Sequence, residues 1–115
     1  MTVLTGTQIP ADLAGPTWRS AGNGSWCIDV GYIRSPWTNR SCGISFLGNG
    51  KRIKRKHVKQ VILPENNIQG RLAAVRTKSG LFDFTHVGLY SPPAGQSYGG
   101  RAKTWNKIID ALGTS

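Results

Sequence analysis

The sequence predicts a single α/β domain of mainly antiparallel strands, followed by one C-terminal amphipathic helix. Three observations lead to this fold class. Short β-rich segments alternate with Gly, Pro and Asn turn signals; residues 71–90 have the composition of a β-hairpin; and residues 101–112 carry an apolar stripe at helical spacing. The chain has 115 residues, which fits one domain spanning residues 1–115.

The first half of the chain predicts three strands. Residues 3–4 give a short strand signal, and residues 11–25 are expected to form a loop with a turn at residues 23–24 (Asn-Gly). Residues 26–33 (WCIDVGYI) alternate between two faces, as strand residues do. Residues 42–48 (CGISFLG) are rich in residues that favour strands, so we expect a third strand there.

The second half predicts three more strands. Residues 48–50 (Gly-Asn-Gly) predict a hairpin-type turn after the preceding strand. Residues 58–63 end in an apolar run that a proline stops, which favours a strand. Residues 71–77 and 81–90 are strand-like and are joined by the Lys-Ser-Gly turn at residues 78–80, so they are expected to form a hairpin.

The C-terminal segment predicts an amphipathic helix over residues 101–112. Trp105, Ile108, Ile109 and Leu112 recur at positions i, i+3, i+4 and i+7, which places them on one face of a helix. Because such an apolar stripe is unfavourable in water, we expect the helix to cover one face of the sheet.

The charge balance indicates the class of partner. Fifteen Lys and Arg residues against five Asp and Glu residues give a formal charge of +10 and a pI near 10.3. Such a charge attracts polyanions, of which nucleic acid is the first candidate and an anionic membrane the second. No apolar run approaches the roughly 18 residues of a membrane span, and no signal peptide is recognisable, so we expect no membrane partner and an intracellular location.

In an intracellular compartment, Cys27 and Cys42 are expected as reduced, buried thiols. A single disulfide bridge between them is the alternative.

The densest group of charges falls within residues 51–59. It comprises six basic residues: Lys51, Arg52, Lys54, Arg55, Lys56 and Lys59. One interpretation is contact with the phosphates of DNA or RNA, where each neutralised phosphate releases counterions. A second is a solvated loop and edge strand, since edge strands often carry Lys. A third is a nuclear localisation signal.

Other candidate residues favour structural roles. The basic residues of the predicted hairpin and helix are expected on solvated faces: Arg71, Arg76, Lys78, Arg101, Lys103 and Lys107. His86 is expected as a half-buried strand residue, because no Ser, Cys or Asp stands at the spacing of a catalytic triad. Trp105 is assigned to the core, whereas Trp37 suits either the core or stacking on a base.

Four segments, in order, carry a family resemblance. They are LTGTQIP (residues 4–10), NRSCGISFLGNG (39–50), the pair GRLAAVRT and FDFTHVGLYSPPAG (70–77 and 82–95), and GRAKTWNKIIDAL (100–112). Together they resemble the middle of the endonuclease/exonuclease/phosphatase (DNase-I-like) superfamily. The resemblance is greatest to the endonuclease domains of LINE-type retrotransposons and their reverse-transcriptase polyproteins.

The resemblance implies about half of a four-layer α/β/β/α sandwich, with the active site at the strand ends. Members of this family bind Mg²⁺ through Asp, Asn and Glu, because hard cations take oxygen ligands, and cleave a phosphodiester with the help of a His–Asp pair. Their metal-binding Glu corresponds to Gly6, and the Asn of their Asn-Val-Tyr motif corresponds to Gly88. Their Tyr, which lies near the scissile phosphate, is kept as Tyr90. The family's remaining catalytic segments would lie before Met1 and beyond Ser115.

These observations predict a degenerate or truncated endonuclease-like domain that is catalytically inactive alone. We expect no cofactor for this chain, although the intact family uses Mg²⁺, and no metal site, because its five acidic residues are scattered. Tyr90 is expected as a vestige of the active site or as a residue of the core or rim. DNA or RNA is expected on the basic cluster, and self-association or a completing second half on the incomplete sandwich. The alternative function is a small basic nucleic-acid-binding module unrelated to any nuclease.

Overall fold

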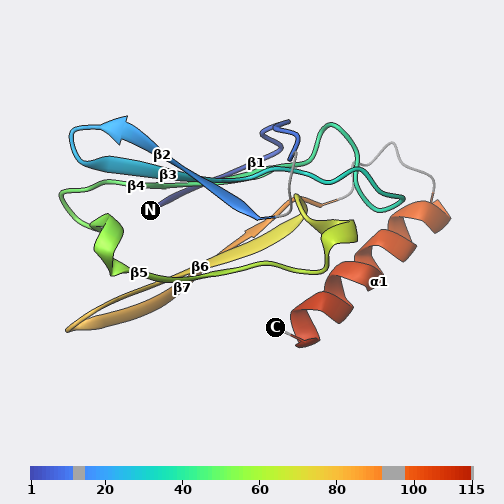
Figure 1. The fold of residues 1–115 in the computed structure, drawn as a ribbon. Coiled ribbons are helices and arrows are strands. Elements are labelled where there is room, and N and C mark those ends of the chain that lie inside the picture. Colours follow the sequence, from blue (N-terminus) through green and yellow to red (C-terminus); the bar gives the residue numbers. More distant parts are fainter. Residues whose placement is uncertain (12–14, 92–97, 115) are drawn as a thin grey trace.

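Two antiparallel sheets pack face to face, and one helix lies at their end (Figure 1). The computed structural model describes residues 1–11, 15–91 and 98–114. The first sheet has the strand order β1 (Thr2–Thr5), β4 (Ile44–Gly48), β3 (Ser25–Val30) and β2 (Pro16–Gly22). The second has the order β5 (Val58–Ile62), β6 (Leu72–Ser79) and β7 (Phe82–Leu89). All five strand pairs are antiparallel, so the predicted mainly antiparallel sandwich is confirmed at this level.

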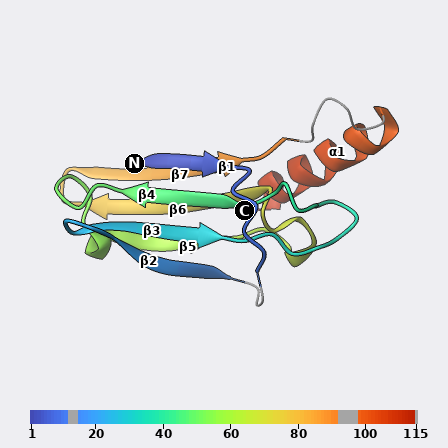
Figure 2. The ribbon, with the colours of Figure 1, turned by 90° about the horizontal axis from the view of Figure 1, so that it is seen from above.

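The two sheets are stacked nearly strand over strand. Seen from above, β1 lies over β7, β4 over β6 and β3 over β5, while β2 extends past the edge of the second sheet (Figure 2). Each sheet therefore has one edge, β1 or β7, on the same side of the sandwich, and the other edge, β2 or β5, on the opposite side.

The core lies between the sheets and follows the alternation of the strands. In β3 the side chains of Trp26, Ile28 and Val30 point inward, and the parity predicted for this segment is correct. They form one buried cluster with residues of β4 and β6: Ile44, Phe46, Ala73 and Val75. Burial of this apolar surface is the main favourable term for closing a two-sheet sandwich.

The loop expected over residues 11–25 is wrong for its second part. Residues 16–22 form β2, an edge strand paired with β3, and residues 12–14 lie outside the described part of the chain. Only Trp18 in β2 is half-buried and the other residues are exposed, so the strand lacks the hydrophobic alternation that sequence reasoning depends on. The Asn23-Gly24 turn is confirmed: both residues have positive φ, 52° and 74°, and they join β2 to β3.

The turn expected after β4 is present, but it does not close a hairpin. The chain leaves the first sheet there and crosses to β5 of the second sheet through a short 3₁₀ helix, η1 (Arg55–His57). The strand predicted at residues 58–63 is confirmed as β5, and the predicted hairpin is confirmed as β6 and β7. A second 3₁₀ helix, η2 (Asn66–Ile68), connects β5 to β6.

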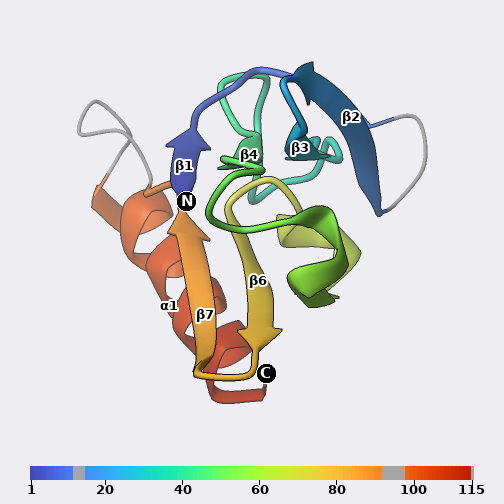
Figure 3. The same ribbon diagram turned by 90° about the vertical axis from the view of Figure 1, so that its left-hand side faces the viewer.

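The C-terminal helix, α1 (Tyr98–Thr114), is present and longer than predicted. It packs at one end of the second sheet (Figure 3), where Ala111 meets Ile68 and Leu72. Ile108 is buried as expected, but Ile109 is 58% exposed, so the predicted stripe is wrong there; the side chain of Leu112 is outside the described part.

Two further predictions concern cysteines and membranes. Cys27 and Cys42 are free and buried, as expected. Within the described ranges, no helix is both long and apolar enough to cross a membrane.

Candidate nucleic-acid interface

Residues 51–59, here called the basic crossover, connect β4 of the first sheet to β5 of the second. Asn49 organises the entry to this segment. Its carbonyl oxygen accepts hydrogen bonds from the backbone N–H groups of Arg52 and Ile53, both at 2.9 Å, and its side-chain oxygen accepts one from Lys51 N–H at 3.0 Å. An Asn side chain that bonds the backbone two residues on is typical of a tight turn. The segment therefore has a defined backbone course.

All six basic residues predicted as a cluster are brought together on the crossover. Each is exposed: Lys51, Arg52, Lys54, Arg55, Lys56 and Lys59. In the described part of the chain, the ion pairs join Arg19 to Asp29, Arg76 to Asp83 and Lys107 to Glu65, so none of the six has a carboxylate partner there. Their positive field is therefore left for an external anion.

Two tryptophans anchor the crossover from the inner face of the first sheet. The indole N–H of Trp26 donates a hydrogen bond of 2.9 Å to the carbonyl oxygen of Ile53. Trp18 lies against Trp26, with ring centroids 5.6 Å apart, and the guanidinium of Arg55 sits 4.5 Å above the Trp18 ring. This cation–π contact orients Arg55 while its side chain stays in contact with solvent.

Sequence reasoning missed the Trp18–Arg55 pair because residues 11–25 were expected to form a loop. The signal that could have revealed it is the Asn23-Gly24 turn, which favours a hairpin with strands on both sides. Extending that hairpin pairs Trp18 with Ile28, on the inner face of the sheet.

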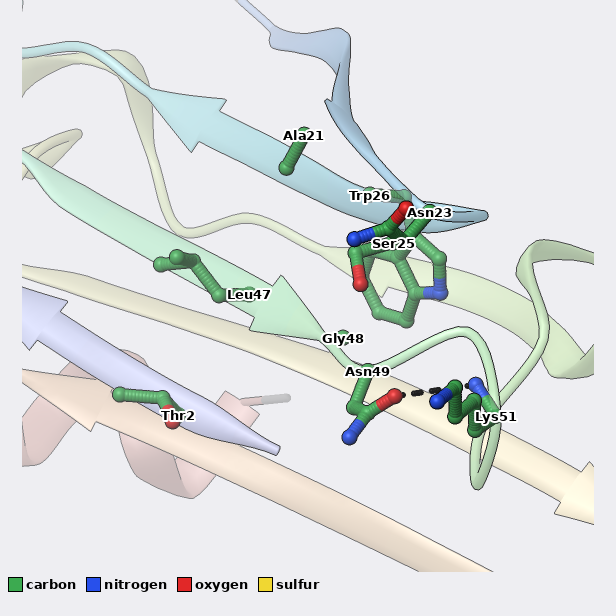
Figure 4. Close-up of a pocket in the computed structure, with 9 residues that line it drawn as sticks. All are labelled: Thr2, Ala21, Asn23, Ser25, Trp26, Leu47, Gly48, Asn49 and Lys51. Atoms are coloured by element: carbon green, nitrogen blue, oxygen red, sulfur yellow. Dashed lines mark hydrogen bonds between the residues drawn. The ribbon is translucent and has the colours of Figure 1, made fainter.

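An open hollow of about 470 Å³ lies beside the crossover, at the turn end of the first sheet (Figure 4). Its lining comes from the β2–β3 turn, the end of β4 and the start of β1. The lining residues are Thr2, Ala21, Asn23, Ser25, Trp26, Leu47, Gly48, Asn49 and Lys51. Lys51 belongs to both features, and Trp26, which borders the hollow, donates a hydrogen bond to Ile53 of the crossover, so the hollow and the basic crossover are continuous.

The positions matched to the family's active site lie together at the far end of the sandwich. A Cβ built on Gly6 would lie 3.0 Å from Cε2 of Tyr90, although the two residues are far apart in sequence. Gly6 also has a φ of +70°, a backbone conformation that residues other than glycine rarely adopt. Tyr90 is half-buried at this place. A glutamate at position 6 would therefore meet both backbone strain and the Tyr90 ring.

Close packing between the two sheets leaves no space for a side chain at position 88. A Cβ there would lie 2.7 Å from Cγ2 of Ile44 and 3.0 Å from Cγ1 of Val3. The family's Asn at this position has no space here.

The expected solvated position of Arg71 is wrong. Arg71 is only 1% exposed. Its guanidinium donates hydrogen bonds to the carbonyl oxygens of Trp37 and Tyr90, the latter at 3.3 Å. It also lies 5.6 Å from the centroid of the Tyr90 ring. Backbone carbonyls thus compensate the buried cation, and Arg71 fixes the Trp37 loop against the end of β7.

The remaining candidates are distributed as follows. His86 is half-buried on β7 and shares a 3.1 Å hydrogen bond with Thr77, and burial lowers its pKa.

Trp37 packs on the Ile68 cluster, which favours its core assignment, and Trp105 is half-buried. Arg76 and Lys107 are held in ion pairs, Lys78 and Lys103 are exposed, and the side chain of Arg101 is outside the described part.

The described residues contain no group of three or more His, Cys, Asp and Glu side chains that could hold a metal ion. One buried carboxylate, that of Asp29, lies on the outer face of the first sheet. The carboxylate of Asp29 accepts hydrogen bonds from Ser45 at 2.6 Å, from Arg19 at 2.5 Å and from Cys27 at 3.3 Å. Both oxygens of this carboxylate already accept hydrogen bonds from the protein. Burial also raises the pKa of the Cys27 thiol, which disfavours the reactive thiolate.

The Asp29 cluster predicts an acid-sensitive contribution to stability. Burial acts to raise the pKa of Asp29, but the hydrogen bonds from Arg19, Ser45 and Cys27 outweigh it and hold the pKa below its ordinary value. The stabilisation is therefore complete above the unfolded-state pKa of about 3.9 and is lost as the pH falls through the lower folded-state pKa. We expect Asp29→Asn to cost about 2 kcal/mol at pH 7. Thermal melts from pH 2 to 7 should show a smaller acid-induced decrease in Tm for the variant; equal decreases would contradict this assignment.

Comparisons of the chain with protein-family models, with curated proteins and with solved structures give no match in any of the three.

Proposed function

We propose that this chain is a catalytically inactive, retroelement-type endonuclease-like domain that binds nucleic acid through the basic crossover. The six basic residues of the crossover support the binding proposal. All six are exposed, and none has a carboxylate partner in the described part of the chain. Hydrogen bonds from Trp26 and to Asn49 fix the backbone that carries them. Cations on a fixed backbone can contact successive phosphates without a large ordering cost.

Three features support the endonuclease-like ancestry. The strand pairing and the stacking of the two sheets agree with about half of a four-layer sandwich. The order of the four resembling segments agrees with the family. The contact between Gly6 and Tyr90 brings together two positions that the resemblance assigns, independently of each other, to one active site.

The proposed inactivity follows from the side chains at that site. Phosphodiester cleavage with Mg²⁺ needs oxygen ligands that hold the ion against the scissile phosphate. Gly6 and Gly88 stand where the family has Glu and Asn, so the site offers the Tyr90 hydroxyl and the Arg71 guanidinium instead. Neither group is a ligand for Mg²⁺ at neutral pH, and we propose that the chain uses no cofactor.

A salt-dependent binding measurement tests the proposed function. Fluorescein-labelled DNA and RNA are titrated with the chain from 50 to 300 mM salt, and anisotropy is recorded. Contact of all six cations predicts a slope of log K against log salt of about −4 for single strands and about −5 for duplex. A slope near zero, or no binding at 50 mM salt, would refute nucleic-acid binding.

The alternative, a nucleic-acid-binding module without nuclease ancestry, uses the same interface. It is favoured by the buried apolar cluster that the two sheets of this chain form between them. A flanking reading frame that encodes Gly-Asp-Phe-Asn and Ser-Asp-His segments would favour the endonuclease-like proposal. We further propose an intracellular and nuclear location, for which the basic crossover would also serve as the localisation signal.

The side of the sandwich that carries the edge strands β1 and β7 predicts self-association or pairing with a completing second half. β1 and β7 are both edge strands on this side, and apolar side chains near it are exposed: Leu4 by 47%, Phe84 by 58% and Val87 by 53%. Unpaired edges with apolar neighbours favour strand addition. We expect sizing chromatography with light scattering to give oligomers at micromolar concentration. A monodisperse monomer that melts cooperatively in calorimetry would contradict this prediction.

A further inference from the structure

The hollow beside the basic crossover has the lining of a site for a flat polar ring. Its volume of about 470 Å³ falls within the range of small-ligand sites, about 300–1,000 Å³. Ala21 and Leu47 contribute apolar surface, the buried Trp26 borders the hollow, and Asn23, Ser25 and Asn49 contribute amide and hydroxyl groups around it (Figure 4). A few polar groups on an apolar wall are typical of sites that orient a ligand through hydrogen bonds.

The polar groups of the lining are free to bind a ligand. Among the described residues, neither the Asn23 amide nor the Ser25 hydroxyl has a hydrogen-bond partner in the protein, and Asn49 uses only its side-chain oxygen, for Lys51 N–H. Asn23 is also held in place by its left-handed backbone, with φ of 52°, in the turn between β2 and β3. Amides held in this way can donate to and accept from the edge of a base.

We infer that the hollow receives one unstacked nucleobase of a single-stranded nucleic acid whose phosphates lie along the basic crossover. This inference rests on the proposed function and specifies its substrate class. Lys51 lies on the rim of the hollow and begins the crossover, so a nucleotide with its base in the hollow has its phosphate at the first of the six cations. A base paired within a duplex presents only its edge in a groove and cannot enter a hollow of this kind.

Arg55 supplies a second surface for the same strand. One face of its guanidinium is covered by Trp18 at 4.5 Å, while the residue remains exposed. Guanidinium planes and aromatic rings both stack on unpaired bases, and such stacking tolerates any base. Trp18 contacts Trp26, which borders the hollow, so the two surfaces lie at the same end of the first sheet, the Arg55 stack on its inner face and the hollow on the face that carries Thr2 and Leu47.

The test compares three labelled probes of one sequence at equal salt: a 20-nucleotide DNA strand, the same strand as RNA, and the blunt DNA duplex. We expect at least one single strand to bind about tenfold more tightly than the duplex. Ala21→Phe should fill the hollow from an exposed bulge position and reduce single-strand affinity about tenfold, while duplex affinity and the salt slope stay unchanged. Thr17→Phe is the matched control, since it adds the same ring to an exposed site of the same strand outside the hollow and should change neither affinity.

A second variant avoids any dependence on the tolerance of β2 for a bulky residue. Asn23→Gly keeps the left-handed backbone and removes the amide, and it should weaken single-strand binding about threefold. Equal affinities for strand and duplex, or unchanged single-strand affinity in both Ala21→Phe and Asn23→Gly, would overturn the inference and leave the proposed function standing. Failure of all three probes to bind would overturn both. A difference between the DNA and RNA strands would identify which of them the site prefers.

Discussion

Neutralising four cations of the basic crossover is expected to lower nucleic-acid affinity about a hundredfold or more at 100 mM salt. The variant replaces Lys51, Arg52, Lys54 and Lys56 together by Gln. Each lost phosphate contact removes about 0.7 from the magnitude of the salt slope for a single strand, so the slope should become less steep by about 3. Arg55 and Lys59 are kept, because Arg55 packs on Trp18 and Lys59 donates to the Lys56 carbonyl oxygen.

A control with the same change in net charge separates position from total charge. Four exposed basic residues elsewhere on the protein are replaced by Gln: Arg34, Arg40, Lys78 and Lys103. We expect this control to lower affinity less than about threefold, because long-range attraction is screened beyond about 10 Å at 0.1 M salt. Equal losses in the two variants would mean that the crossover is an ordinary solvated segment and that only the overall charge attracts nucleic acid.

Placing at position 88 the asparagine that the proposed ancestry assigns there is expected to destabilise the fold severely. In Gly88→Asn the new Cβ would overlap Ile44 and Val3 between the two sheets, which costs about 1–3 kcal/mol for overpacking. The buried amide, without partners there, costs about 1–3 kcal/mol more. Small domains are stable by only about 5–15 kcal/mol, so a decrease in Tm of about 10 °C or more should follow.

Gly80→Asn is the matched control for that substitution. Gly80 lies in the exposed turn between β6 and β7, and nothing approaches within 4 Å of a Cβ built there. We expect its Tm to stay within about 2 °C of the unmodified chain. If Gly88→Asn melted equally close to the unmodified chain, packing would not explain why position 88 carries glycine.

The strands that sequence reasoning found are rich in residues that favour strands and are bounded by strong turns. The segment of β3, which is buried on both faces, and the hairpin of β6 and β7 are of this kind. β2 was missed because it is an exposed edge strand that forms by backbone pairing with β3. Its residues lack the apolar alternation that would indicate a strand. The helix was found, but its buried stripe runs through Thr104, Ile108 and Ala111, where small residues allow close approach to η2.

The candidate site was predictable in part, for a physical reason. A run of exposed cations is visible in sequence because its members are neighbours along the chain. The hollow, the Trp18–Arg55 stack and the buried Arg71 each depend on residues that are far apart in sequence and meet only in the folded chain. Arg71 in particular was expected in solvent, since its compensation comes from backbone carbonyls that no residue type reveals.

We propose that this chain binds nucleic acid and does not cut it. The most direct measurement incubates one highly purified preparation with supercoiled plasmid and 5′-labelled oligonucleotides, with Mg²⁺ or with EDTA, and records binding and strand breaks together. We expect salt-sensitive binding without Mg²⁺-dependent nicks, for the unmodified chain and for Gly6→Glu alike. Nicks that require Mg²⁺ and disappear in Tyr90→Phe would contradict the claim.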